Sequence, residues 1–446
     1  MKITVKLDTN GILIGGEYKL LMVSSLFYFR IPKEQWENRM QTLISAGYNA
    51  IDVYFPWNYH EIKPNQWIFE GNRDIDTFLK LAKKNNLYVI ARPGPYICSE
   101  WDGGGIPSWL YLEDIPIRQN DKRYLNRLQS WYEKVISMIR DHQITHDGSV
   151  ILLQLENELD YYNCSQPAEY IEQLVQMAKN IGVNVPFIYC CGQDDIKGGG
   201  GEADNIFPAF NIYSEADDIS LEERCLHLYK FVSEAGNPFL VTETNREHSY
   251  LKRLLSCGAK MISPYNQTAS TTMDYYNAIT NWGTKSMPLA LLSSDYDFNS
   301  MIGSDGTLTR EYIYARLFCG LINSFEKEIA AAKPRLCENE ITIDKNSQKI
   351  LPILTTEKGS FIPVTNFIKR KRKIKCKLSG YNTVVELEPW YTALLPLRLR
   401  VTSKAVIAWS NYEIAFVNHQ GDITQVALYG YGELNLLIEN NSKTNY

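Results

Sequence analysis

Short apolar runs alternate with amphipathic stretches along most of the chain. Apolar runs of about four to eight residues indicate buried strands, whereas apolar residues at i, i+3 and i+4 indicate helices. Strands that alternate with helices are typical of a parallel sheet covered by helices. The pattern therefore predicts an α/β fold of the (β/α)8 type, a TIM barrel. The expected barrel strands are residues 22–28, 50–55, 87–92, 150–155, 186–190, 206–212, 238–243 and 259–264.

Three stretches between these strands have the periodicity of amphipathic helices, namely residues 75–83, 123–140 and 168–180. Residues 2–16 instead alternate like two strands, with Asn10-Gly11 suited to a tight turn between them. We expect this hairpin to cap the N-terminal end of the barrel.

After about residue 325 the pattern changes to short strand-like runs separated by turn residues. Long helical patterns no longer occur, which favours a small all-β, sandwich-like domain. A chain of 446 residues is also longer than a typical single domain. We therefore predict a catalytic barrel with its hairpin over residues 1–325 and an antiparallel β domain over residues 326–446. The strand-like runs that predict the β domain are residues 349–354, 360–364, 373–378 and 405–409.

Two carboxylates lie at the ends of predicted barrel strands. Glu158 follows the apolar residues 150–153, and Glu243 ends the seventh predicted strand. Active sites of such barrels are built at the C-terminal ends of the strands. Retaining hydrolysis of a glycosidic bond needs two carboxyl groups about 5–5.5 Å apart, and barrel closure permits this pairing. The alternative is a surface ion pair for each residue, with Arg246 as the partner of Glu243.

Several motifs surround these carboxylates. The chain reads AGYNAIDVYFPWNYHE over residues 46–61, YVIARPGPYICSEW over 88–101, GGIPSWL over 104–110 and QLENE over 154–158. In order and spacing they resemble the catalytic domain of glycoside hydrolase family 35, whose best-known members are retaining β-galactosidases. The resemblance is strongest over residues 15–160, extends to about residue 320 and is faint beyond.

The resemblance implies an exo-acting retaining β-glycosidase with Glu158 as the acid/base and Glu243 as the nucleophile. It also implies contacts to a terminal galactose, although Glu100 could instead cap its loop and Cys98 could be a small buried side chain. Trp57 and Trp101 are interpreted as cavity wall or core, and His60 as structural. The residues expected to bind the sugar are Tyr54, Cys98, Ser99, Glu100, Asn157, Tyr265 and Tyr296.

Two segments depart from the family pattern. Residues 244–248 replace an aromatic and Gly-Trp-containing loop, and residues 266–270 replace a glycine-rich segment. Tyr296 is retained but its partner tyrosine is Ser294, so Tyr265 is the candidate hydroxyl beside the nucleophile. Because these loops shape the sugar pocket, three hypotheses stay open: a β-galactosidase, an exo-β-glycosidase for another sugar such as β-glucosaminide, and a sugar-binding barrel without catalysis.

Composition adds expectations about partners. The net charge of −5 gives no reason to expect nucleic acid or an anionic membrane as a partner. The nine cysteines follow no metal-binding pattern and nothing at the predicted barrel mouth has the spacing of metal ligands, so we expect no metal. No cofactor is expected either. The first residues alternate like a strand rather than a signal peptide, and the unpatterned thiols fit a cytoplasmic protein. The expected partner is a terminal β-linked sugar of an oligosaccharide or glycoconjugate. The sequence is compatible with a monomer and with a homo-oligomer.

Overall fold

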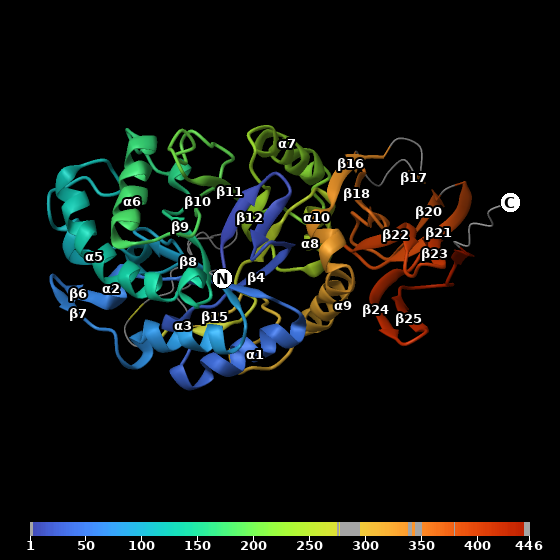
Figure 1. Ribbon diagram of the computed structural model, residues 1–446, viewed down its shortest axis with the longest axis horizontal. Helices are drawn as coiled ribbons and strands as arrows, with labels where there is room; N and C mark the ends of the chain where they lie inside the picture. The colour runs from blue at the N-terminus through green and yellow to red at the C-terminus, as the bar shows by residue number, and fades with distance from the viewer. Residues whose placement is uncertain are drawn as a thin grey trace.

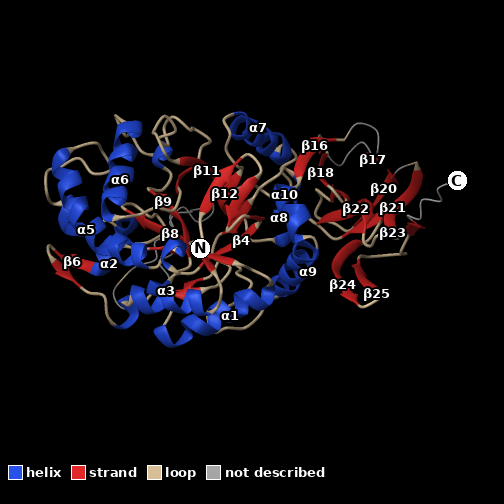
Figure 2. Cartoon of the chain, in the orientation of Figure 1, coloured by secondary structure: helices blue, strands red, loops and turns tan. Residues whose placement is uncertain are grey.

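The computed structural model describes residues 3–273, 276, 295–337, 341–343, 350–378 and 380–440. In Figure 1 the chain forms a larger part, blue to yellow, and a smaller part, orange to red. Figure 2 shows that helices surround the strands of the larger part, whereas the smaller part consists mainly of strands. Two helices of the larger part, α8 (His248–Ser256) and α9 (Arg310–Ser324), pack against the smaller part.

Eight parallel strands close into a barrel, as the sequence predicts. Nearly every strand residue is buried, because side chains fill the interior and helices cover the outside. This two-sided burial is why the strands are continuous apolar runs in the sequence. The strands are β4 (Leu21–Ser25), β5 (Ala50–Tyr54), β8 (Tyr88–Gly94), β9 (Val150–Leu155), β10 (Phe187–Cys191), β11 (Phe207–Ile212), β12 (Leu240–Thr244) and β13 (Met261–Pro264).

The first barrel strand is shorter than predicted. It ends at Ser25 rather than at residue 28, and Tyr28–Arg30 form a 3-10 helix. The turn directs Arg30 inward, where its Nη2 donates to the carbonyl oxygen of Ser99 at 2.6 Å. The segment after the first strand thus connects through a buried guanidinium to the loop that contains Ser99.

Helices follow the strands and cover the barrel. The three predicted helical stretches correspond to α3, α5 and α6, each with an apolar face buried against the barrel. The main helices are α1 (Trp36–Ala46), α3 (Ile75–Lys84), α5 (Lys122–Asp141), α6 (Pro167–Ile181), α7 (Leu221–Glu234), α8 and α9; shorter ones are α2 (Trp57–His60), α4 (Ser108–Tyr111) and α10 (Glu326–Ala331).

A three-stranded antiparallel sheet precedes the barrel. Strands β1 (Val5–Asp8) and β2 (Gly11–Ile14) pair as a hairpin, and β3 (Glu17–Lys19) adds a third strand that the sequence pattern does not predict. Gly11 lies against the side chain of Lys260, at the N-terminal end of β13. The small sheet is therefore at the barrel end opposite the predicted catalytic residues.

The C-terminal part is antiparallel. Its largest sheet has six strands in the order β16-β18-β19-β22-β23-β26, and β17, β20 and β21 form a second sheet. The predicted domain limit between residues 325 and 326 falls between α9 and α10. The strands are β16 (Lys333–Leu336), β17 (Ile341–Ile343), β18 (Pro352–Thr356), β19 (Gly359–Thr365), β20 (Arg372–Leu378), β21 (Tyr381–Leu387), β22 (Thr392–Arg400), β23 (Ala405–Ser410), β24 (Glu413–Gln420), β25 (Ile423–Tyr429) and β26 (Leu436–Asn440).

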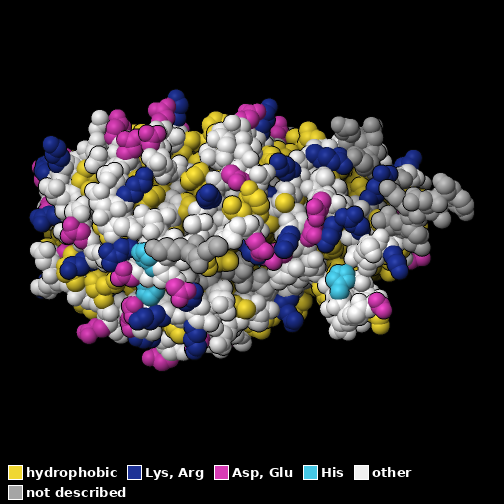
Figure 3. Space-filling view, viewed as in Figure 1, with side chains coloured by type: hydrophobic (Ala, Val, Ile, Leu, Met, Phe, Trp, Pro, Cys, Tyr) yellow, Lys and Arg dark blue, Asp and Glu magenta, His cyan; other side chains and the backbone are white. Residues whose placement is uncertain are grey.

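Charged side chains of both signs are interspersed over the face that Figure 3 shows. Among the described helices, none combines the length and apolar character needed to span a bilayer.

A buried ion pair joins the two parts. Lys252 of α8 donates to Glu413 of β24 at 2.6 Å, and both side chains are 3% exposed. The same ammonium group donates to the hydroxyls of Tyr391 at 2.9 Å and Tyr429 at 3.2 Å. Three side chains of the β domain thus surround one desolvated charge of a barrel helix.

We predict that Lys252→Met destabilises the protein by about 3–5 kcal/mol, because it leaves the Glu413 carboxylate buried without a counter-charge. Chemical denaturation followed by tryptophan fluorescence measures the effect. Lys80→Met is the control, since Lys80 and Asp76 form an exposed ion pair that solvent screens, and its loss should change the stability little. Equal effects of the two substitutions would contradict the prediction.

Candidate active site

A cavity of about 730 Å³ opens at the C-terminal ends of the barrel strands. Its volume is within the range of roughly 300–1,000 Å³ typical of ligand sites. Both predicted carboxylates, Glu158 and Glu243, line it. The other lining residues are Cys98, Ser99, Glu100, Tyr161, Gly192, Asn211, Tyr213, Arg224, Arg246, Tyr265 and Phe298.

Glu158 follows β9 with left-handed backbone angles (φ 47°, ψ 50°), which are uncommon for a residue other than glycine. Asn211, at the end of β11, donates from Nδ2 to Glu158 Oε1 at 2.9 Å. Burial, and next the negative charge of Glu243, raise the pKa of Glu158 to about 7. A carboxyl group with this pKa is partly protonated near neutral pH and can donate a proton to a substrate.

Gly192 makes the space that Glu158 occupies. A Cβ atom at this position would lie 2.6 Å from Glu158 Oε1 and 2.2 Å from the ring of Tyr161. Such contacts are far shorter than van der Waals separation, so only glycine fits without moving the carboxyl group. The sequence shows Gly192 merely as the residue after β10, without a signal of this contact.

Glu243 lies in β12 and accepts hydrogen bonds on both carboxylate oxygens. Arg92 Nη2 donates to Oε1 at 2.6 Å, Tyr54 Oη donates to Oε1 at 2.9 Å, and Tyr213 Oη donates to Oε2 at 3.1 Å. Donors of this kind, one of them a cation, stabilise a negatively charged carboxylate. The arrangement suits a carboxylate that attacks carbon rather than one that gives up a proton.

Arg92, at 2% exposed, is the cation that holds this site together. From β8 it donates to Asp52 Oδ2 on β5 at 3.2 Å, to Glu243 on β12, and to the side-chain oxygen of Asn157 after β9. Burial raises the pKa of Asp52 to about 6, an effect that the charge of Arg92 opposes. The network thus connects four strands beneath the cavity.

The loop after β8 carries three successive residues with positive φ: Cys98 (53°), Ser99 (60°) and Glu100 (41°). Arg30 holds it, donating from Nη1 to Ser99 Oγ at 2.9 Å and from Nη2 to the Glu100 carbonyl oxygen at 3.3 Å. This strained backbone brings all three residues to the cavity wall. Sequence reasoning identified the three residues but not the role of Arg30.

Tyr265 differs from the expectation that its hydroxyl lies beside the nucleophile. It donates to Glu100 Oε2 at 3.3 Å and hydrogen-bonds the Tyr296 hydroxyl at 2.6 Å. Tyr296 also donates to the Glu100 carboxylate. Because these two tyrosines pair around Glu100, the hydroxyls on Glu243 come from Tyr54 and Tyr213 instead. Ser294, the residue in the partner tyrosine's place, lies outside the described residues.

The predicted sugar-binding residues fall into two groups. Cys98, Ser99, Glu100 and Tyr265 line the cavity. Tyr54, Asn157 and Tyr296 are at most 2% exposed, and their polar atoms hold Glu243, Arg92 and Glu100 in place. These three buried residues therefore hold the groups that line the cavity or lie beneath it.

The aromatic residues singled out in the sequence are core. Trp57 is fully buried and stacks on Trp131, and Trp101 donates from its indole nitrogen to Asn58 Oδ1 at 2.8 Å. His60 is buried against the Tyr28 hydroxyl, and burial lowers its pKa to about 3. A neutral histidine at this position has the structural role expected for it.

Sequence reasoning missed Tyr161, Gly192, Asn211, Tyr213, Arg224 and Phe298 as lining residues. Asn211 could have been identified from the sequence, since it is a polar residue near the end of the apolar run that forms β11. Arg92 and Asp52 could also have been identified, because each is a charged residue inside a buried strand. Within the described part of the chain, no group of three His, Cys, Asp or Glu side chains is placed to hold a metal ion.

Comparison with known proteins places the chain among glycoside-cleaving enzymes. The sequence profile described as "Glycosyl hydrolases family 35" matches residues 11–321. A β-galactosidase of Canis lupus familiaris is 29% identical over 77% of this chain and 52% of its own length, and one of Felis catus is 30% identical over the same shares. A β-galactosidase-1-like protein of Mus musculus is 29% identical over 68% of the chain and 47% of its own length.

The chain spans about half the length of these relatives. The profile match runs from β2 into α9, so it includes the whole closed barrel and both carboxylates of the cavity. The chain therefore belongs to glycosyl hydrolases family 35.

Proposed function

We propose that the protein removes terminal β-galactose from its substrate by double displacement with retention of configuration. Glu243 is the nucleophile and Glu158 the acid/base. The observation that carries this proposal is the contrast between two carboxyl groups of one cavity: burial and Glu243 raise the pKa of Glu158 to about 7, whereas three donors surround Glu243. Paired carboxyls in such unlike environments are the basis of acid and nucleophile roles in glycosidases.

In the first step Glu158 gives its proton to the glycosidic oxygen while Glu243 attacks the anomeric carbon. The carbon–oxygen bond to the leaving group breaks, and a glycosyl ester forms on Glu243. In the second step Glu158, now a carboxylate, takes a proton from water. That water attacks the anomeric carbon, and the electron pair of the ester bond returns to Glu243.

The change of role of Glu158 follows from its environment. Because the charge of Glu243 raises the pKa of Glu158, formation of the neutral ester removes that effect and lowers the pKa. The same residue is then a proton donor before the ester forms and a proton acceptor afterwards. Asn211, which bonds the Glu158 carboxyl, favours its charged form in the second step.

The choice of galactose rests on the names of the relatives, which are β-galactosidases. Residues 244–248 and 266–270 depart from the family pattern, so another terminal sugar such as β-glucosaminide is the second candidate. A binding barrel without catalysis is disfavoured because both carboxylates line one cavity. Hydrolysis of a panel of nitrophenyl β-glycosides distinguishes the three.

We predict that Glu243→Gln abolishes both steps, since the amide cannot form the glycosyl ester. Glu158→Gln should still react with nitrophenyl substrates, whose good leaving groups need little protonation, and then stall at the ester. Each loss should be on the order of 10³-fold or more in turnover of a poor leaving group such as that of lactose. Azide, which needs no base, should restore turnover of Glu158→Gln and yield a β-glycosyl azide.

The control is Glu113→Gln, which alters a surface ion pair with Arg127 and should retain activity. Full activity of Glu158→Gln on lactose would refute its assignment as the acid. Rescue of Glu243→Gln by azide with a β-glycosyl azide as product, without rescue of Glu158→Gln, would exchange the two roles, because azide that takes the place of a lost nucleophile yields the α-azide.

The pH dependence provides a separate prediction. The free enzyme needs protonated Glu158, so kcat/KM should fall as pH rises through about 7. Asn211 stabilises the charged form of Glu158 and so lowers its pKa; Asn211→Ala should shift this basic limb to higher pH. The prediction is contradicted if the basic limb of the kcat/KM profile does not move in Asn211→Ala and is still present in Glu158→Gln. A group other than Glu158 would then determine that limb.

A further inference from the structure

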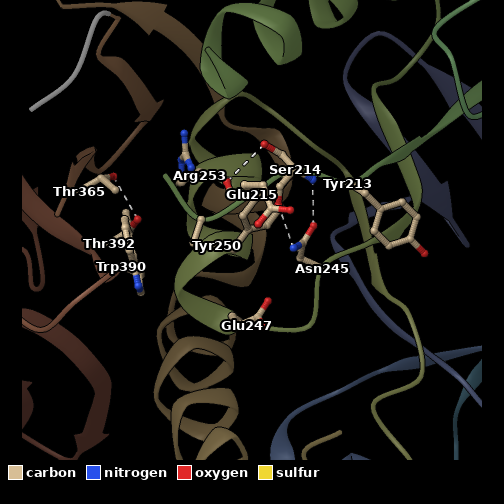
Figure 4. Close-up of a pocket in the computed structure, with 11 residues that line it drawn as sticks. Tyr213, Ser214, Glu215, Asn245, Glu247, Tyr250, Arg253, Thr365, Trp390 and Thr392 are labelled. Atoms are coloured by element: carbon tan, nitrogen blue, oxygen red, sulfur yellow. Dashed lines mark hydrogen bonds between the residues drawn. The ribbon is translucent and has the colours of Figure 1, made fainter. Parts of the chain in front are cut away.

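A second cavity, of about 570 Å³, lies between the barrel and the β domain. The barrel contributes residues that follow β11 and β12, including Ser214 and Asn245, and the β domain contributes Trp390 (Figure 4). Ser214 N donates to Asn245 Oδ1 at 3.1 Å, and Asn245 Nδ2 donates to the Ser214 carbonyl oxygen at 3.0 Å, which fixes the two loops to each other. The cavity therefore opens on the same barrel face as the catalytic carboxylates.

One buried donor of this cavity lacks an acceptor among the described residues. Arg253 is 2% exposed; its Nε and Nη2 bond the Glu222 carboxylate, both at 2.7 Å, but Nη1 has no partner. Buried polar groups in native proteins are nearly always paired. Arg253 lines the cavity, so a ligand with hydroxyl or other oxygen acceptors would give its Nη1 a partner.

Trp390 is held in an unusual conformation at the cavity. Its φ of 58° is rare for a large side chain and indicates a backbone constrained by its surroundings. Ser249 of α8 supplies the constraint: its Oγ donates to the Trp390 carbonyl oxygen at 3.3 Å and accepts from Thr392 N at 2.6 Å. The barrel thus fixes a partly exposed indole of the β domain at the cavity wall.

The remaining lining groups restrict the kind of ligand. Glu215 and Glu247 are exposed carboxylates, which repel an anion and accept hydrogen bonds from hydroxyls. A purely apolar ligand would leave Arg253 Nη1 without an acceptor. An aromatic face beside carboxylates and the unpaired Nη1 of Arg253 suits a neutral sugar, which has both an apolar face and a rim of hydroxyls.

Tyr213 connects this cavity to the catalytic one, since it lines both. In Figure 4 its ring points away from the other labelled residues, and its hydroxyl donates to Glu243. A terminal sugar held by the catalytic carboxylates would direct its leaving group toward the open barrel face. The second cavity lies on that face. Tyr213 lines both cavities, and the next residue, Ser214, lines the second one.

We infer that the second cavity is a distal subsite that binds a neutral sugar unit of the leaving group. This inference rests on the proposed function and narrows its substrate class to β-galactosyl oligosaccharides of three or more sugars. The β domain then takes part in substrate binding through Trp390.

The test compares kcat/KM for a β-galactosyl oligosaccharide series, from lactose to a neutral tetrasaccharide, in the wild type and in Trp390→Gly. Glycine accepts the positive φ, so this substitution removes the indole without adding strain. We expect the wild type to prefer the longer substrates. Trp390→Gly should lower kcat/KM for the tetrasaccharide relative to lactose by about tenfold or more, as expected for the loss of one aromatic contact.

Glu215→Ala, a change at an exposed lining residue, should reduce the same ratio, and Tyr381→Ala is the control. Tyr381 is an exposed aromatic residue of the β domain that does not line the cavity. A ratio unchanged in both Trp390→Gly and Glu215→Ala would overturn the inference, as would a wild type indifferent to chain length. If the wild type cleaves no nitrophenyl β-galactoside, the proposed function fails; calorimetric binding of the tetrasaccharide, lost in Trp390→Gly, would still support the subsite.

Discussion

The buried guanidinium of Arg92 is the interaction on which the site depends. It contacts Asp52, Asn157 and Glu243, which come from different parts of the barrel wall. Breaking a buried ion pair of this kind typically costs about 3–5 kcal/mol, because the remaining charges are desolvated without compensation. The barrel must therefore close for Arg92 to be satisfied, and Arg92 must be in place for Glu243 to be held as a carboxylate.

The unlike environments of the two glutamates follow from this centre. Glu243 lies over Arg92 and receives hydroxyls from Tyr54 and Tyr213. Glu158 is at the far end of β9 in a left-handed turn, with Asn211 as its side-chain donor and Gly192 leaving room for it. One fold thus surrounds one carboxyl with three donors and raises the pKa of the other to about 7.

Sequence alone predicts the barrel because strands buried on both sides are continuous apolar runs. It also points to Glu158 and Glu243, since each follows such a run. It does not predict which tyrosine reaches Glu243: Tyr213 and Tyr265 both follow strands, and the choice depends on how Tyr265 pairs with Tyr296. Nor does it reveal the Gly192 contact or the Lys252–Glu413 pair, because these join residues that only the folded chain brings together.

The account rests on Glu243 as the residue that becomes covalently attached to the sugar. An activated 2-deoxy-2-fluoro-β-galactoside slows the second step and lets the glycosyl ester accumulate, so intact-protein and peptide mass spectrometry can identify the attached residue. The account predicts one sugar per chain, on the peptide that contains Glu243, with release of label and recovery of activity on dilution. Label on Glu158, or inactivation with the sugar on any other residue, would contradict it.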